Sequence, residues 1–160
     1  MDTTILNQVA AEFGAPLYVY DSARIQTQFE RLTEAFKSVP RLKLNYAAKA
    51  LSNISILRLM KHLGSGLDTV SIQEVRLGLL AGFAPEDIIY TPNGVSLGEL
   101  EEAAALGVQI NIDNLSVLEQ FGSSHPHVPV CIRINPHAVS YTHLTLPTTS
   151  ALCRSRWSRG

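Results

Sequence analysis

The chain has 160 residues, of which 46% are hydrophobic and 17% are charged. This length and apolar content are enough for one hydrophobic core, and the low share of charge argues against a disordered chain or a nucleic-acid-binding protein. The formal charge of −1 is unevenly distributed. Residues 1–138 hold all 14 acids and 10 of the 13 Lys and Arg, whereas residues 139–160 hold three Arg and no acid. This break in composition predicts that the last segment has a different origin.

The cysteines and histidines indicate neither a disulfide framework nor a metal site. Cys131 lies in an apolar run and is expected to be a buried free thiol, and Cys153 has no partner at a useful spacing. His62 is expected on a helix surface, and His125 and His127 flank a proline at a spacing that matches no metal site.

The N-terminus lacks a basic segment followed by an apolar stretch, and no apolar run approaches about 18 residues. We therefore expect a cytoplasmic protein that does not bind membranes.

The N-terminal region is predicted to form a helix, a strand and a second helix. Apolar residues at helical spacing predict the first helix over residues 3–13, with Gly14 as its stop. The run 16–20 resembles a strand. Asp21 or Ser22 can then cap a helix that extends to about residue 37.

From residue 42, short strand-like runs alternate with helical patterns. The strands are expected at 42–48, 66–71, 88–91, 108–113 and 130–135, and the helices at 54–63, 72–82, 97–106 and 116–121. Such alternation implies parallel strands joined by right-handed crossovers. Both a doubly wound sheet and an eight-fold α/β barrel have this pattern, and the absence of a G-x-G-x-x-G motif after the first strand weakens the dinucleotide-binding alternative.

In a parallel barrel, reactive groups lie at the carboxyl ends of strands. The predicted ends carry these residues: Lys49; Asp68 and Ser71; Pro92, Asn93 and Gly94; Asp113 and Asn114; Arg133 and Asn135. Lys49 is the most informative, because a lysine that loses water at a strand end becomes nucleophilic and can form a Schiff base with a carbonyl. A solvated lysine at a strand edge is the alternative that periodicity alone leaves open.

Three charged residues accompany this lysine. Asp68 follows an apolar strand and is either a site carboxylate or a helix-capping residue. Glu74 falls in the first turn of the next predicted helix, where the helix dipole favours an acid. Arg133 lies within the apolar run 130–134, so it is expected to have a partner or a function.

Several segments resemble, in order, the ornithine, diaminopimelate and arginine decarboxylase superfamily. They are the cofactor-lysine motif at 45–50, the Gly-Leu-Asp-Thr-Val-Ser-Ile-Gln-Glu block at 66–74, and the segments at 14–21, 81–93, 110–116 and 131–136. Together they cover residues 1–138 nearly without gaps. Within the superfamily, the branch that decarboxylates meso-diaminopimelate to L-lysine matches best at 14–21 and 133–136.

This resemblance implies a fold, a cofactor and roles for the site residues. The fold would be a partial (β/α)8 barrel with about five of eight strands (42–138), preceded by a helix–strand–helix unit (1–41) that belongs to or adjoins a β-rich domain. Lys49 would bind pyridoxal phosphate, Asp68 and Glu74 would position Lys49, and Arg133 would anchor an acidic group. A homodimer acting on a small amino acid in lysine biosynthesis is implied, while the segment itself is expected to be inactive alone.

Two alternatives to this function remain open. One is another enzyme of the same barrel, such as an ornithine or arginine decarboxylase or an alanine racemase. The other is a barrel that binds the cofactor without catalysis. Residues 139–160 resemble the translation of a transposon-type sequencing adapter, and we interpret them as a non-native tail without function.

Overall fold

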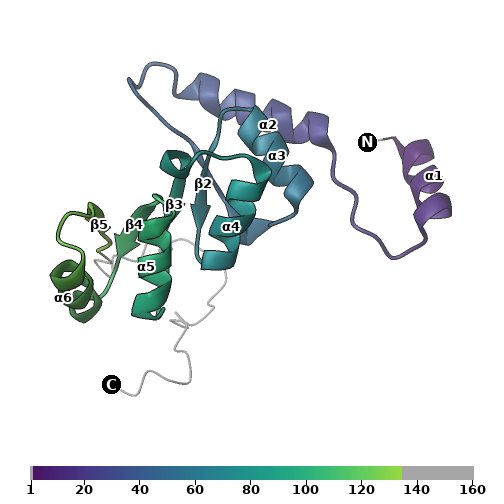
Figure 1. The fold of residues 1–160 in the computed structure, drawn as a ribbon. Helices are drawn as coiled ribbons and strands as arrows, with labels where there is room; N and C mark the ends of the chain where they lie inside the picture. The colour runs from purple at the N-terminus through teal and green to yellow at the C-terminus, as the bar shows by residue number, and fades with distance from the viewer. Residues whose placement is uncertain (1, 135–160) are drawn as a thin grey trace, which may run out of the picture.

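The computed structural model describes residues 2–134 and contains five short parallel strands in one sheet, in the order β1-β2-β3-β4-β5 (Figure 1). The strands are β1 (Asn45–Ala47), β2 (Gly66–Thr69), β3 (Ile88–Tyr90), β4 (Gln109–Ile112) and β5 (Val130–Ile132). The α-helices are α1 (Thr3–Phe13), α2 (Ser22–Ala35), α3 (Ile54–His62), α4 (Ile72–Ala81), α5 (Leu97–Ala105) and α6 (Leu115–Ser124). Two 3-10 turns, η1 (Ala48–Ala50) and η2 (Pro85–Asp87), were not predicted.

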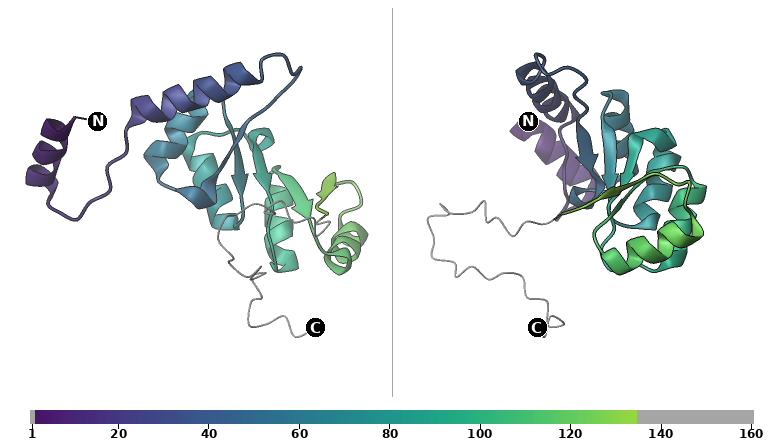
Figure 2. Two further views of the ribbon diagram at one scale, coloured as in Figure 1. Left: turned by 180° about the vertical axis from the view of Figure 1, so that it is seen from behind. Right: turned by 90° about the vertical axis from the view of Figure 1, so that its left-hand side faces the viewer.

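The sequential strand order decides between the two predicted architectures. Each strand pairs in parallel with the one that precedes it in the chain, for example Ala47 with Asp68 and Asp68 with Ile89. Right-handed crossovers between successive strands place all connecting helices on one face, whereas a doubly wound sheet reverses its order and covers both faces. Figure 2 shows α3, α4 and α5 on one side of the strands. The fold is therefore an incomplete α/β barrel of the predicted kind.

The core lies between the sheet and this helix layer. Strand side chains facing the helices are fully buried, and they meet apolar side chains from α3, α4, α5 and α6. The largest buried members are Leu57, Leu67, Val75, Ile88, Tyr90, Leu100, Ile110 and Phe121. Because alternate strand residues point to opposite faces, the residues between these positions point away from the helices, to the face that we call the inner face of the sheet.

Side-chain caps explain where the helices begin. Asp2, Asp21, Asn53 and Asn114 each accept a hydrogen bond from a backbone N–H of the first turn of their helix. Helix α1 ends at Gly14, whose φ of 84° is easily adopted only without a Cβ. The predicted bounds of both N-terminal helices agree with the structure to within about two residues.

The predicted strand at 16–20 is wrong for the described part of the chain. This run has no regular secondary structure, and Tyr18 is 91% exposed. A strand needs a neighbour to satisfy its backbone groups, and no described segment pairs with this run. Helix α1 buries no residue and lies apart from the other elements in Figures 1 and 2. None of the helices described between residues 2 and 134 is long and apolar enough to cross a membrane.

Glycine 78 tests the packing of α4 on the sheet. A Cβ at this position would overlap Cδ2 of Leu67 and lie 3.2 Å from Cδ1 of Ile88. Gly78→Ala is therefore expected to lower the free energy of unfolding by about 1–3 kcal/mol, measured by urea denaturation. Gly98→Ala in α5 is the matched control, because nothing lies within 4 Å of the added Cβ. It is expected to raise the free energy by about 0.5–1 kcal/mol. Equal effects of the two substitutions would contradict the packing described.

Candidate functional site

The inner face of the sheet carries polar side chains at the carboxyl ends of neighbouring strands. Leu67 and Ile88 point toward α4, since both lie close to Gly78. The alternation of strand side chains therefore turns Asp68 and Ile89, which pair with each other, to the inner face. Asn111, which pairs with Cys131 on β5, lies on the same inner face, because its neighbours Ile110 and Ile112 are buried in the core.

Lys49 lies in η1, directly after β1 and two residues beyond Ala47, the pairing partner of Asp68. The site lysine and the candidate carboxylate thus come from adjacent strands, as expected. The Lys49 side chain is exposed among the described residues, as in the solvated alternative that periodicity left open, and its role at a site stays a prediction. The physical reason is that the sheet formed by residues 45–132 is open, so nothing described covers this end.

Tyr46, which the sequence analysis did not single out, fixes the turn that carries Lys49. Its hydroxyl donates a hydrogen bond of 3.1 Å to the carbonyl oxygen of Leu51, just beyond the turn. Burial raises the pKa of the Tyr46 phenol, and Tyr20 raises it further. The phenol therefore stays protonated and remains a donor to this carbonyl near neutral pH. Tyr46 lies within the cofactor-lysine motif at 45–50, and this position in the sequence could have indicated its role.

Asp68 is not a helix cap but part of a hydrogen-bonded row across three strands. The hydroxyl of Thr91 lies 3.1 Å from Oδ1 of Asp68, and Nδ2 of Asn111 lies 2.9 Å from the same hydroxyl. The N-cap of α4 is Ser71 instead. Thr91 and Asn111 were missed by sequence reasoning, although their positions at the ends of β3 and β4 give a signal through strand alternation.

Glu74 lies in the first turn of α4, three positions after the N-cap Ser71. Its Oε2 accepts a hydrogen bond of 2.8 Å from the backbone N–H of Val70, and its own N–H donates to Oγ of Ser71 at 3.2 Å. The structure therefore gives Glu74 a local role in shaping the turn that follows β2. Any contact with a cofactor stays a prediction.

Arg133 and Cys131 lie at the opposite edge of the sheet from Lys49. The backbone N–H of Arg133 donates to the carbonyl of Ile112 at 2.8 Å, but its side chain is exposed. Cys131 is also exposed, and its Sγ lies 3.2 Å from Nε2 of Gln109. The expected burial of Cys131 is thus wrong within residues 2–134, because β5 has no described neighbour on its outer side. A partner or a function for Arg133 stays a prediction.

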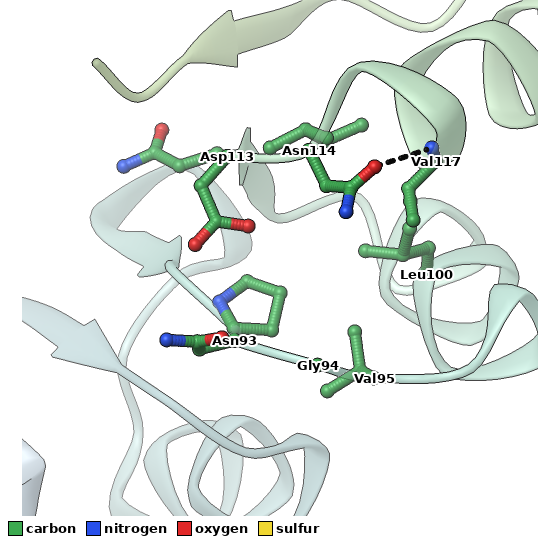
Figure 3. A pocket seen from close by; sticks show the side chains of 10 residues that line it. Asn93, Gly94, Val95, Leu100, Asp113, Asn114 and Val117 are labelled. Carbon is green, nitrogen blue, oxygen red and sulfur yellow. Dashed lines mark hydrogen bonds between the residues drawn. The ribbon is translucent and has the colours of Figure 1, made fainter. Parts of the chain in front are cut away.

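The carboxyl ends of β3 and β4 enclose a cavity of about 200 Å³ between the loops that lead into α5 and α6. Its lining includes Pro92, Asn93, Gly94, Asp113 and Asn114, which are five of the residues predicted at the carboxyl ends of strands. Figure 3 shows the Asp113 carboxylate directed toward the Asn93 side of this cavity. Asn114 is partly committed elsewhere, because its Oδ1 accepts from the N–H of Val117 at 3.2 Å.

The cavity brings together only part of the predicted site. Lys49, Asp68, Glu74 and Arg133 are not among its lining residues. In the part of the chain that the structure describes, no cluster of three His, Cys, Asp or Glu is arranged to hold a metal ion. Asn135, also named at a strand end, lies outside the described residues.

Comparisons with known proteins agree on one family. Residues 22–151 match the family model described as pyridoxal-dependent decarboxylase, pyridoxal binding domain. The diaminopimelate decarboxylase of Methanothermobacter thermautotrophicus is 40% identical over 131 residues, which are 81% of this chain and 31% of that protein. The chain spans about a third of the length of the curated relatives it matches. The matched range continues past residue 138, and residues 135–160 lie outside the described structure.

Solved structures show the same fold. Diaminopimelate decarboxylase from Helicobacter pylori, complexed with L-lysine, is 37% identical with a TM-score of 0.74, covering 89% of this chain and 36% of that one. Lysine/ornithine decarboxylase from Vibrio vulnificus, complexed with putrescine, is 27% identical with a TM-score of 0.73. It covers 82% of this chain and 36% of that chain.

The residues around η1 fit a pyridoxal group in their chemistry. A pyridoxal aldehyde requires a primary amine that it can reach, and the Lys49 amine is exposed at a strand end. The adjacent inner face offers the carboxylate of Asp68 and the polar groups of Thr91 and Asn111 rather than an apolar surface. The donor set is therefore compatible with a polar aromatic cofactor held through Lys49.

Glu74 provides a test that separates hydrogen bonding from charge. Gln keeps a side-chain oxygen that can accept from Val70, so Glu74→Gln is expected to cost less than about 0.5 kcal/mol of unfolding free energy. Glu74→Ala loses the acceptor and is expected to cost about 1 kcal/mol, as is Ser71→Ala at the N-cap. Thermal and urea unfolding of the three variants measure this. A Gln variant as unstable as the Ala variant would show that the negative charge, not the hydrogen bond, is what matters.

Proposed function

The chain belongs to the pyridoxal-dependent decarboxylases, and from this premise we propose that its full-length form converts meso-diaminopimelate to L-lysine and carbon dioxide, the last step of lysine biosynthesis. By full-length form we mean the parent protein, in which residues 1–134 are followed by the further part of the length that the curated relatives have. The observation that carries the proposal is the position of Lys49, an exposed amine that directly follows β1 beside the strand that carries Asp68.

Pyridoxal phosphate is the cofactor of this family, and when bound it supplies a ring that accepts the electrons left on the substrate as carbon dioxide departs. The role of the chain's own residues is to hold and orient this cofactor. Lys49 would hold the cofactor through its amine nitrogen. The Asp68 carboxylate, on the adjacent strand, would attract a positive charge on Lys49 or on the cofactor.

Two further residues have supporting roles in this proposal. Glu74 would keep the turn after β2 in shape through its bond to Val70, and so hold Asp68 and the start of α4 in a fixed relation. Arg133, at the end of β5, would anchor an acidic group of cofactor or substrate, because its guanidinium is exposed at the carboxyl end of the sheet.

The choice of diaminopimelate rests on relatives. Several curated relatives of that name are 31–40% identical to the chain. A solved lysine/ornithine decarboxylase and one of the solved diaminopimelate decarboxylases are both 27% identical. Because the lysine/ornithine decarboxylase has a similar fold, decarboxylation of ornithine or lysine is the competing function. The proposal also includes a homodimer in the cytoplasm, the latter supported by the low cysteine content of the chain.

Lys49 is expected to be the residue that binds the cofactor. The full-length form incubated with pyridoxal phosphate should develop the absorbance of a lysine-bound pyridoxal, and Lys49→Ala should abolish it. Borohydride reduction followed by peptide mapping should place the label on Lys49. Lys61→Ala, which removes an exposed lysine from the end of α3, is the control and should leave the band unchanged. A label on any other lysine would overturn the assignment.

The substrate is tested by carbon dioxide release. We expect the full-length form to release carbon dioxide from meso-diaminopimelate at least about tenfold faster, per unit concentration, than from ornithine, lysine or arginine. A radiometric assay with all four amino acids measures this. A preference for ornithine or lysine would favour the competing decarboxylase, and cofactor binding without any turnover would favour a non-catalytic barrel.

The 160-residue chain is expected to be inactive by itself and to give a lower soluble yield than the full-length form. The five described strands leave the sheet open, and Ile132 and Ile134 near its edge are 60% and 78% exposed. An exposed apolar edge strand promotes association between chains. Size-exclusion chromatography and the carbon dioxide assay, run on both forms in parallel, measure this. A monodisperse and active 160-residue chain would be the contrary result.

A further inference from the structure

The row formed by Asp68, Thr91 and Asn111 is unusual because the partly buried Thr91 side chain supports another polar side chain rather than the backbone. Most side-chain hydrogen bonds in proteins go to backbone or water. Here the hydroxyl of Thr91 bridges Oδ1 of Asp68 at 3.1 Å and Nδ2 of Asn111 at 2.9 Å, all within the partly buried inner face.

Hydrogen-bond chemistry gives this row one direction. An ionised carboxylate can only accept, so the single hydroxyl proton of Thr91 must be donated to Asp68. The lone pairs of that hydroxyl then accept from the amide nitrogen of Asn111, which fixes the amide orientation. The Thr91 rotamer is held from both sides, and one oxygen of Asp68 is held with it.

At the Asn111 end of the row, the observed orientation of the amide is unfavourable for the free energy of folding. Oδ1 of Asn111 is buried and has no hydrogen-bond partner among the described residues. A buried unsatisfied acceptor is unfavourable for folding. Turning the amide over would offer this oxygen to Thr91, but it would then compete with Asp68 for the hydroxyl proton. The observed arrangement therefore keeps Asp68 supplied with a donor.

We propose that Thr91 and Asn111 are positioning residues that hold the Asp68 carboxylate in the orientation in which it serves the cofactor bound at Lys49. This inference rests on the proposed function, and it deepens that function by adding Thr91, directly after β3, and Asn111, in β4, to the site. Neither residue is assigned contact with the cofactor. Their effect passes through Asp68, whose strand neighbours β1 and the turn that contains Lys49.

The decisive comparison is between two substitutions of Thr91. Thr91→Val keeps the branched shape and removes the hydroxyl, whereas Thr91→Ser keeps the hydroxyl and removes a methyl group. A role limited to β-sheet packing favours Val over Ser, because branched side chains suit strands. A positioning role gives the opposite order, because only Ser can donate to Asp68.

The structure offers a matched control in Thr69. This residue is fully buried on β2, and its hydroxyl donates to the carbonyl of Ile89 at 2.9 Å, on the neighbouring strand but not to Asp68. Thr69→Val therefore removes one buried hydrogen bond of similar length without changing the row. Asn111→Leu is a second probe, since it removes the donor to Thr91 together with the unsatisfied Oδ1, and it should cost little stability.

The variants are compared in the full-length form by titration with pyridoxal phosphate. The readouts are the affinity for the cofactor, the circular dichroism of its absorption band, and the fraction of Lys49 labelled after borohydride reduction. Thr91→Val and Asn111→Leu are expected to weaken the affinity about tenfold and to reduce the dichroic signal, the loss expected for a hydrogen bond to a charged group. Thr91→Ser and Thr69→Val are expected to stay within about twofold of the parent.

Each possible result decides the question. An affinity of Thr91→Val equal to the parent, or a Val variant better than the Ser variant, overturns the positioning role. The same holds if Thr69→Val weakens the affinity as much as Thr91→Val, since the effect would then be one of stability. Failure of the parent itself to label at Lys49 would refute the proposed function instead, so the two failures are distinguishable.

Discussion

Parallel pairing of successive strands is the constraint on which the rest of the structure depends. Every strand pairs with the one before it, so every connection must cross over in the same sense. All crossover helices between residues 45 and 132 then lie on one face, and the strands acquire one apolar side and one side that none of these described helices covers. The same pairing places the carboxyl ends of all strands along one edge. The core and the candidate site are consequences of this single arrangement.

The two faces of the sheet are chemically distinct because of strand alternation. Leu67, Ile88 and Ile110 are fully buried toward the helices, and substitutions there change packing. Asp68 and Asn111, each one position along from a buried neighbour, face the inner side, where their polar groups meet through Thr91. A shift of one residue in register would exchange the two sets, so the apolar helix layer also fixes which polar groups belong to the site.

Because the described sheet is open, some side chains at its two edges are more exposed than their sequence context indicates. Lys49 follows the strand at one edge, and Cys131 and Arg133 lie in or just after the strand at the other. A closed barrel brings its first and last strands together, and it surrounds the carboxyl ends with loops from all strands. In residues 45–132 the two edges remain apart, so the lysine and the arginine occupy opposite ends of the described site.

From residue 42 on, the sequence by itself determined the order of strands and α-helices, their positions to within a few residues, and the placement of Lys49 and Asp68 at the ends of adjacent strands. These follow from local signals: apolar periodicity, capping residues and the resemblance of consecutive motifs. The barrel rather than the doubly wound sheet was decided by strand order, a property of pairing that periodicity does not contain.

Tertiary structure alone decided which polar side chains meet. The bonds of Thr91 to Asp68 and Asn111 join residues more than 19 positions apart in the chain, and they depend on parallel register. It also decided that Glu74 accepts a hydrogen bond from the backbone of Val70, that the run 16–20 forms no strand, and that Cys131 and Arg133 are exposed. The physical reason is common to all of these. A side chain's burial and its hydrogen-bond partners depend on which distant segments lie beside it, and a local pattern of residues does not encode that neighbour.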